Sequence, residues 1–307
     1  MRSAPGVATI GAFLIGGCMS PVVSADWLAN HLTDDNLVIA DCRFALSDPE
    51  LGRQEYNIGH IPGAVYFDLD QDLSGAVQSH GGRHPLPELN DLVACFSAAG
   101  IGSDPSSPDS QTTVVVYDDS RFAFAARLWW LLRYLGHDRV FVLDGGFSEW
   151  HAAGYPVTAD ETEPCPRSFV PLVRSQHLVD YATVLERQAL PSVALIDSRE
   201  SDRYRGEREP IDPVAGHIPG ALNYFWKDVS DEQGRLRLPT YHQQRWAAIA
   251  EAEEIMVYCG SGVTACVNLL SLELAGRSNA KLYVGSWSDW CSYSDSPKAT
   301  CVTDPSS

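Results

Sequence analysis

The sequence lacks several features that define large classes of proteins. Basic residues are few, with 22 Lys and Arg against 40 Asp and Glu, so the net charge is -18. No block of five like charges occurs, and an acidic surface of this kind repels nucleic acid and anionic membranes. Beyond the N-terminus, no stretch approaches the roughly 18 apolar residues that a membrane-spanning helix needs. We therefore expect no nucleic-acid and no membrane partner, and any anion site must be locally basic.

The cysteines lack the spacing of a metal site or of a disulfide framework. Eight are present, but no C-x-x-C motif occurs and the gaps between them are irregular. A chain this long and apolar also has little need of disulfides. We expect no metal and no cofactor, and reduced thiols that are mostly buried, as in a cytosolic protein.

The N-terminal segment permits two interpretations. Residues 7–18, VATIGAFLIGGC, are apolar, follow a single Arg2, and end like a lipoprotein signal, which would make the protein exported or lipid-anchored. Alternatively the start is over-extended, because Met19 directly precedes SPVVSADWLANHL, which is typical of the beginning of a domain. We favour the second interpretation and expect a cytoplasmic protein.

The chain does have the length and the apolar content of a protein with two packed domains. It contains 307 residues, of which 45% are hydrophobic, and eight are Trp. This composition is typical of globular proteins and excludes a disordered chain.

Four blocks of the sequence occur twice, in the same order. The pairs are VIADCR (38–43) with ALIDSR (194–199), GHIPGAVYFDLD (59–70) with GHIPGALNYFWKD (216–228), VVVYDD (114–119) with IMVYCG (255–260), and LDGGFSEW (143–150) with YVGSWSDW (283–290). Repeats of this length indicate two copies of one domain. The first copy is longer because it contains an additional segment, LSGAVQSHGGRHPLPELNDLVACF.

Each copy alternates short apolar runs with helical patterns, which predicts an α/β fold with a parallel sheet covered by helices on both faces. Strands are expected at 37–40, 114–117, 140–143, 193–196, 255–258 and 282–284, and helices at 125–136 and 264–276. We expect an N-terminal extension (1–20), a first domain (21–155), a linker rich in Pro and acidic residues (156–171), a second domain (172–293) and a C-terminal tail (294–307).

The stretch VYCGSGVTA, residues 257–265, places a cysteine between a predicted strand and a predicted helix. Ligands of open parallel sheets lie beyond the carboxyl ends of the strands. The amides of residues 260–265 and the helix N-terminus would stabilise negative charge on the Cys259 sulfur, and Gly260 and Gly262 allow unusual dihedrals. The first copy has Asp118 at this position and neither glycine. We therefore expect chemistry in the second copy only, with Cys259 as the nucleophile.

A cysteine on such a loop is also typical of phosphatases. Those enzymes use a C-x5-R motif whose arginine holds the phosphate, but Ala265 stands where that arginine would fall. The loop therefore suits a smaller anion, and a persulfide on Cys259 fits.

Together, CGSGVTA, the two GHIPGA blocks, LDGGFSEW and GSWSDW resemble the two-domain thiosulfate/3-mercaptopyruvate sulfurtransferases of the rhodanese superfamily, from residue 21 to about 293. The resemblance implies two tandem rhodanese-like domains, the first non-catalytic and the second catalytic. It also implies a double displacement, in which Cys259 takes sulfur from a small-molecule donor and a thiol, cyanide or a thioredoxin-like protein accepts it. A non-catalytic rhodanese module that binds sulfur is the alternative, although that class typically lacks the cysteine.

The residues after the cysteine favour 3-mercaptopyruvate as the donor. In the family, thiosulfate-preferring members carry basic residues there, whereas Gly260 and Ser261 resemble the mercaptopyruvate enzymes. Arg203 matches the family's arginine for the substrate carboxylate, which it would hold through two hydrogen bonds. We expect this arginine and the loop to bind the substrate, the loop residues being Gly260, Ser261, Gly262, Val263 and Thr264.

Two features of the resemblance leave alternatives open. Ile211 or Asp212 stands where a second substrate arginine is expected; Arg205 or Arg208 could substitute, and thiosulfate remains an alternative donor. The resemblance also implies that Ser261 forms a relay with a His and an Asp of the first copy, and the matching candidates are His60 and Asp48. Arg83 and His84 belong to the additional segment of the first copy and could close over the cleft, but nothing in the sequence shows that they do.

Overall fold

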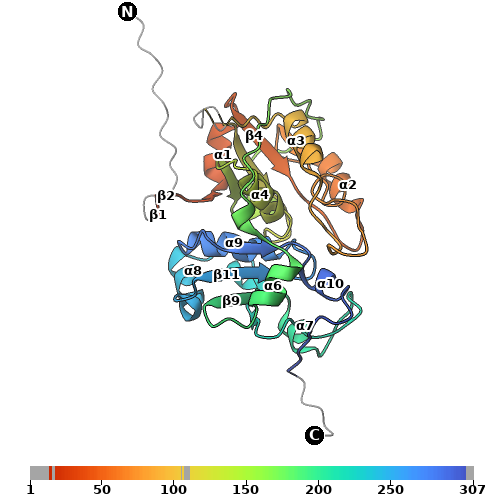
Figure 1. Ribbon diagram of the computed structural model, residues 1–307. Helices are drawn as coiled ribbons and strands as arrows, with labels where there is room; N and C mark the ends of the chain where they lie inside the picture. Colours follow the sequence, from red (N-terminus) through yellow and green to blue (C-terminus); the bar gives the residue numbers. More distant parts are fainter. Residues whose placement is uncertain (1–13, 16–17, 105, 107–110, 302–307) are drawn as a thin grey trace, which may run out of the picture.

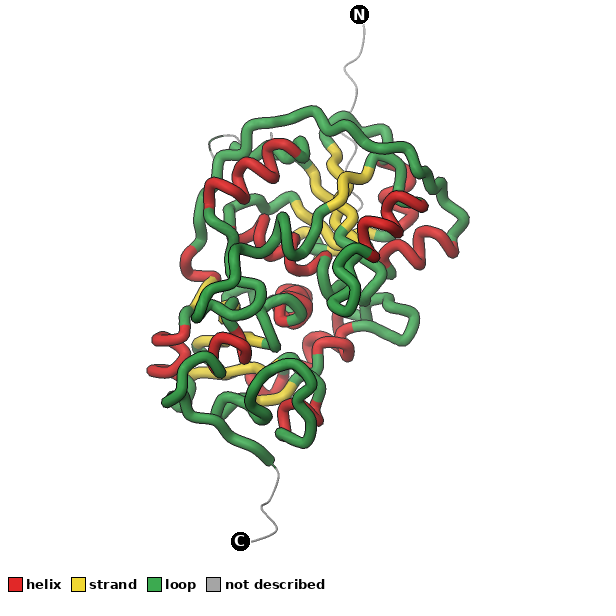
Figure 2. Tube along the Cα trace, turned by 90° about the vertical axis from the view of Figure 1, so that its right-hand side faces the viewer, coloured by secondary structure: helices red, strands yellow, loops and turns green. Residues whose placement is uncertain are grey.

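The computed structural model describes residues 14–15, 18–104, 106 and 111–301. Most of the signal-like segment at 7–18 lies outside these ranges. Within them the chain forms two α/β domains, one above the other in Figure 1, and each is built around its own sheet (Figures 1 and 2). A short antiparallel pair, β1 (Leu14–Ile15) and β2 (Cys18–Met19), precedes the first domain.

The first domain contains a five-stranded parallel sheet with strand order β3-β7-β6-β4-β5. Its strands are β3 (Val22–Val23), β4 (Leu37–Asp41), β5 (Ala64–Tyr66), β6 (Thr113–Tyr117) and β7 (Val140–Leu143). Its helices are α1 (Ala25–His31), α2 (Leu51–Ile58), α3 (Leu89–Ala98), α4 (Ala125–Tyr134) and α5 (Gly146–Ala152).

The second domain repeats this architecture with the strand order β8-β12-β11-β9-β10. The strands are β8 (Leu178–Val179), β9 (Val193–Asp197), β10 (Leu222–Asn223), β11 (Glu254–Tyr258) and β12 (Lys281–Tyr283). The α-helices are α6 (Tyr181–Arg187), α7 (Ser201–Arg205), α8 (Pro239–Arg245), α9 (Ala265–Leu274) and α10 (Ser286–Trp290), and short 3-10 helices occupy Ser175–His177, Trp226–Val229 and Ala247–Ile249. The equal strand orders confirm the tandem fold predicted from the repeats.

The central strands are buried on both faces, as continuous apolar runs of parallel sheets require. In β6, Val114 and Val116 face one hydrophobic cluster, whereas Val115 and Tyr117 face another on the opposite side. The first of these clusters continues into the second domain, because α4 packs against α9. The two domains therefore share one core, and α4 and α9 lie at their junction (Figure 1).

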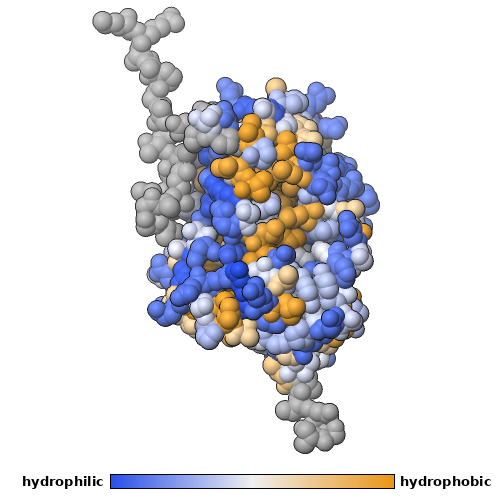
Figure 3. Space-filling view, viewed as in Figure 1, coloured by the Kyte–Doolittle hydropathy of each residue, from blue (hydrophilic) through white to orange (hydrophobic). Residues whose placement is uncertain are grey.

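On the face seen in Figure 1, hydrophobic residues gather over the upper domain and near its junction with the lower one, and hydrophilic residues surround them (Figure 3). In the part of the chain that the structure describes, no helix combines the length and the apolar character needed to cross a membrane.

Candidate active site

The cysteine loop connects β11, which ends at Tyr258, to α9, which begins at Ala265. Cys259 is buried, with 2% of its surface exposed. Gly262 has a φ of +78°, and a Cβ on it would lie 2.2 Å from the carbonyl oxygen of Val284. The prediction that glycine supplies an unusual dihedral is therefore confirmed at Gly262.

The same prediction is wrong for Gly260, whose φ does not lie in the left-handed region. The absence of a side chain there leaves room for the guanidinium groups, because a Cβ would lie 3.0 Å from Nη2 of Arg83 and 3.8 Å from both terminal nitrogens of Arg203. The backbone next to the cysteine is thus in close contact with two guanidinium groups. The sequence alone allows Arg83 to close over the cleft but does not show that it meets Arg203 at Gly260, because the two arginines belong to different domains.

A serine in a strained conformation holds the cysteine backbone in place. Ser286 has a φ of +56°, and its Oγ accepts a hydrogen bond from the amide of Cys259 (3.1 Å) and donates one to the carbonyl of Tyr283 (2.8 Å). Non-glycine residues in this region store strain and gather at functional sites. Its counterpart in the first copy is Gly146, with a φ of +57°, so aligning the repeats would have identified this position.

The loop after the cysteine contains a run of backbone amides. Among the described residues, the amides of 260–265 donate no hydrogen bond to any protein group. Uncommitted amides in a turn that leads into a helix form an anion-binding arrangement.

The first domain shows what the equivalent loop does with an anion. The carboxylate of Asp118 accepts four hydrogen bonds of 2.8–3.0 Å from the amides of Ser120, Phe122, Phe124 and Ala125. Arg121 and Phe122 take positive φ values of 60° and 72° in this loop. A fixed carboxylate therefore fills the amide cradle of the first copy, where the second copy has a cysteine.

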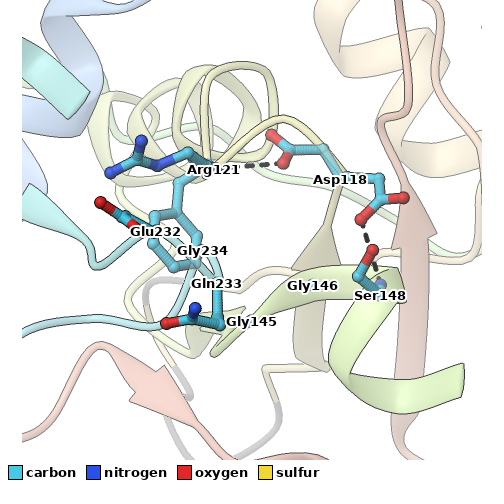
Figure 4. A pocket seen from close by; sticks show the side chains of 10 residues that line it. Asp118, Arg121, Gly145, Gly146, Ser148, Glu232, Gln233 and Gly234 are labelled. Atoms are coloured by element: carbon cyan, nitrogen blue, oxygen red, sulfur yellow. Dashed lines mark hydrogen bonds between the residues drawn. The ribbon is translucent and has the colours of Figure 1, made fainter. Parts of the chain in front are cut away.

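A cavity of about 170 Å³ lies beside the Asp118 loop (Figure 4). The loop between the 3-10 helix at Trp226–Val229 and α8 closes it from the second domain through Glu232, Gln233 and Gly234. Arg121 connects the domains here, because its guanidinium donates to Ser230 Oγ (2.8 Å) and to the carbonyl of Lys227 (2.5 Å).

The structure does not bring His60 or Asp48 to Ser261, so the predicted relay is wrong in its two partners. His60 is fully buried in the first domain, where Nδ1 contacts the carbonyl of Tyr56 (2.7 Å) and the ring stacks on the Tyr56 ring. His217 makes the same two contacts with Tyr204 in the second domain. The GHIPGA histidines therefore stabilise the turn in both copies. Asp48 is exposed.

His84 occupies the position that the relay prediction gave to His60. Its Nδ1 lies 2.7 Å from Ser261 Oγ, and its Nε2 lies 3.4 Å from a carboxylate oxygen of Asp70. Burial lowers the pKa of His84 to about 4, and the nearby Arg127 and Arg83 add to this effect. The imidazole is therefore neutral near pH 7, and one ring nitrogen can accept a proton.

Arg203, on α7, lies at the cysteine loop as predicted, but it already has acidic partners. Its Nη2 contacts Glu209 Oε1 (2.7 Å) and Asp212 Oδ2 (3.1 Å). Neither of the proposed substitutes reaches the loop, because Arg205 pairs with Glu207 and Arg208 pairs with Asp202 at exposed positions. The arginine that does reach it is Arg83.

Arg127 on α4 passes behind the cysteine loop and was not anticipated from the sequence. The side chain is fully buried and donates to the carbonyls of Gly262 (3.2 Å), His84 (3.3 Å) and Leu73 (3.4 Å). Burial lowers its pKa, and the thiols of Cys266 and Cys259 act in the opposite direction. A buried cation therefore connects the loop to the segment that carries His84.

The other predicted loop residues differ in how they face the site. Val263 is buried and packs in the shared hydrophobic core, so only its backbone is available to a ligand. Thr264 is half-buried and occupies the N-cap position of α9 without a side-chain capping bond. Among the described residues, no group of three or more His, Cys, Asp or Glu is placed to hold a metal ion.

Comparison with known proteins agrees with this arrangement. A family model described as "Rhodanese-like domain" matches residues 24–153 and 180–293. A probable 3-mercaptopyruvate sulfurtransferase of Pseudomonas aeruginosa is 44% identical over 284 residues, covering 91% of this chain and 98% of the relative. A putative thiosulfate sulfurtransferase, SseB, of Mycobacterium tuberculosis is 36% identical, covering 84% and 89%.

A solved structure has the same two-domain arrangement. The crystal structure of SseA from Escherichia coli, described as a 3-mercaptopyruvate enzyme, superposes with a TM-score of 0.75 at 32% identity and covers 88% of this chain and 99% of SseA. Two matched rhodanese domains, these relatives and the cysteine loop lead to one assignment: the chain belongs to the rhodanese family, as a two-domain sulfurtransferase.

Proposed function

We propose that the protein moves a sulfane sulfur from 3-mercaptopyruvate to a thiol or cyanide acceptor through a persulfide on Cys259. The observation that carries this proposal is the buried cysteine at the start of a loop whose amides donate to no protein group in the described part of the chain. Such amides stabilise a negative sulfur without a cofactor. In this proposal residues 172–293 form the catalytic domain and residues 21–155 the non-catalytic one.

The transfer of sulfur to the enzyme is a displacement at the donor's sulfur atom. The Cys259 thiolate attacks the thiol sulfur of mercaptopyruvate, and an S–S bond forms while the C–S bond breaks. The electron pair of that bond passes to the methylene carbon, giving the enolate of pyruvate, which takes up one proton. An acceptor thiolate or cyanide then attacks the outer sulfur, and the Cys259 thiolate is regenerated.

Ser261 and His84 are placed to move the proton in this step. The Ser261 hydroxyl lies within hydrogen-bond distance of a neutral imidazole, and both residues are buried, each being 7% exposed. His84 can accept the proton of the donor thiol through Ser261 and return it to the enolate, which is general acid–base catalysis. Asp70, at 3.4 Å, orients the ring from its solvent side.

Thiosulfate is the alternative to mercaptopyruvate as the donor. Relatives named for 3-mercaptopyruvate and Gly-Ser after the cysteine support mercaptopyruvate. A relative named for thiosulfate keeps a thiosulfate:cyanide sulfurtransferase as the alternative. We propose a small thiol or a thioredoxin-like protein as the acceptor, and the cytoplasm as the location.

Intact-mass measurement tests the proposal directly. Incubation with 3-mercaptopyruvate is expected to add the mass of one sulfur atom at Cys259 and to release one equivalent of pyruvate. Steady-state rates with mercaptopyruvate and thiosulfate then identify the preferred donor. A protein that gains no sulfur from either donor would be a sulfur-binding module without this activity.

A further inference from the structure

Asp212 stands where the anionic group of a donor would be expected. One of its carboxylate oxygens contacts Arg83 and the other contacts Arg203, at 3.1 Å from Nη2. These are the two arginines whose guanidinium groups border Gly260. The side chain of Asp212 is 1% exposed, so a buried carboxylate of the protein itself bridges the cations beside the nucleophile.

The cluster around Asp212 carries no excess positive charge. Ion pairs connect three guanidinium groups with three buried carboxylates and with Glu200, whose side chain is 40% exposed; the other members are Arg83, Arg199, Arg203, Asp197, Glu209 and Asp212. A donor anion that entered this cluster would add an uncompensated buried charge, which is strongly unfavourable. Binding of the donor therefore requires that one resident carboxylate gives up its arginine partner or takes up a proton.

Asp212 is the carboxylate that can give up its arginine partner. Glu209 is held by both Arg199 (3.2 Å) and Arg203 (2.7 Å), and it also accepts the amide of Asp212 (3.1 Å). Burial raises the pKa of Asp212, with Arg83 acting against this effect, whereas the pKa of Glu209 is lowered. The charged form of Asp212 is therefore less stabilised than the charged form of Glu209.

Arg83 is the arginine that is free to turn. Its side chain is 34% exposed, and Asp212 is its only carboxylate partner among the described residues, whereas the side chain of Arg203 is 9% exposed and has several. The backbone beneath Arg83 is fixed to the second domain, because the amides of Gly81 and Arg83 donate to Asp289 (2.7 Å) and to Ser288 (3.2 Å). A long side chain on a fixed backbone can change its partner without moving the segment.

We propose that Asp212 is a resident competitor for the donor's anionic group, and that this group displaces it from Arg83, an arginine which the first domain supplies to determine donor specificity. The inference rests on the proposed function. It assigns the role of the second substrate arginine, which is expected near residue 212, to Arg83 of the first domain. In the free enzyme Asp212 holds Arg83 beside Gly260. In the donor complex Arg83 and Arg203 hold the anion.

Binding of pyruvate tests the exchange without relying on turnover. Pyruvate carries the keto-carboxylate of the proposed donor, and its affinity can be measured by calorimetry on the Cys259→Ser protein. Adding Asp212→Asn, which keeps the shape and removes the charge, is expected to tighten binding at least threefold. Adding Arg83→Gln is expected to weaken it about tenfold, through the loss of one charge-assisted contact. Asp202→Asn and Arg208→Gln, which alter an exposed ion pair on the same segment, are the matched controls and should change nothing.

The outcomes separate this inference from the proposed function. If Asp212→Asn weakens pyruvate binding or leaves it unchanged, Asp212 is a structural clamp and the exchange is refuted. The same holds if pyruvate binds none of the variants. If wild-type enzyme forms no persulfide from mercaptopyruvate while the pyruvate affinities shift as expected, the proposed donor is wrong and the exchange stands. If Arg83→Gln and Asp212→Asn shift KM for mercaptopyruvate but not KM for its uncharged primary amide, both the exchange and the proposed donor are supported.

Discussion

Replacing Gly262 by alanine should damage the cysteine loop far more than a glycine-to-alanine change elsewhere. Two effects add at this position. The φ of +78° disfavours any L-residue by about 1–2 kcal/mol. The new Cβ would also lie 2.2 Å from the carbonyl oxygen of Val284, 3.0 Å from its carbonyl carbon and 3.1 Å from its Cα. These are backbone atoms directly after β12, so they cannot rotate away as a side chain could.

Gly154 provides the matched control. Its φ is +77°, but a Cβ there would meet nothing within 4 Å. Alanine returns about 0.4–1 kcal/mol by restricting the unfolded chain, so Gly154→Ala should destabilise the protein by only about 0.5–1 kcal/mol. At Gly262 the steric term adds about 1–3 kcal/mol, which gives a total of about 2–4 kcal/mol.

Urea denaturation of both variants measures this difference, and steady-state kinetics measures its effect on catalysis. A loop displaced by about 1 Å loses roughly a hundredfold in rate, so kcat/KM of Gly262→Ala should fall by about that factor while Gly154→Ala stays near wild type. Equal destabilisation of the two variants would refute the steric argument. Full activity in Gly262→Ala would refute the claim that the loop conformation positions the sulfur.

Three further predictions concern the nucleophile, the relay and the first-domain cradle. Cys259→Ser should abolish both sulfur uptake and turnover, whereas Cys266→Ser, at a buried thiol within α9, should still gain one sulfur by mass spectrometry; equal loss in both would contradict a single nucleophile. His84→Ala should lower kcat about 10²–10⁴-fold. Because the pKa of His84 is lowered to about 4 from 6.5, kcat of the wild type should stay level from neutral pH downward and fall only as the pH approaches about 4, and a midpoint near 6.5 would argue against a buried base. Asp118→Ala should destabilise the protein by about 3 kcal/mol or more, since four buried amides lose their acceptor; persulfide formation at Cys259 should persist in this variant, and its loss would mean that the cradle acts on catalysis.

The architecture was largely predictable from the sequence because its signals are local or repeated. The four repeated blocks predicted the duplication, which the equal strand orders confirm, and the predicted central strands match β4, β6, β7, β9, β11 and β12 within about a residue. The edge strands β3, β5, β8 and β10 were missed, since they contain only two or three residues. Runs that short carry too little periodicity to be distinguished from loops.

The site was predictable where one segment determines it and unpredictable where two domains meet. Cys259 and its loop follow from one stretch of sequence, and Arg203 lies within 3.8 Å of where a Cβ on Gly260 would be. The resemblance implies a relay histidine and His60 is the matching candidate, but the GHIPGA motif that contains it stabilises a turn in both copies. Arg127 reaches the loop because α4 packs against α9, whereas His84 and Arg83 reach it because the segment that carries them is bonded to Ser288 and Asp289. No local pattern encodes these contacts between the domains.

Both copies supply residues to the site, so the two copies must be kept together when domains are exchanged between relatives. The first copy has Asp118 where the second copy has the cysteine, yet it supplies His84, Arg83 and Arg127 to the site around the cysteine loop. Neither domain can therefore be exchanged between relatives without changing the site. In a chimaera that joins the first copy of one relative to the second copy of another, the reactive cysteine and Arg203 would come from one parent, and the residues at the positions of His84, Arg83 and Arg127 would come from the other.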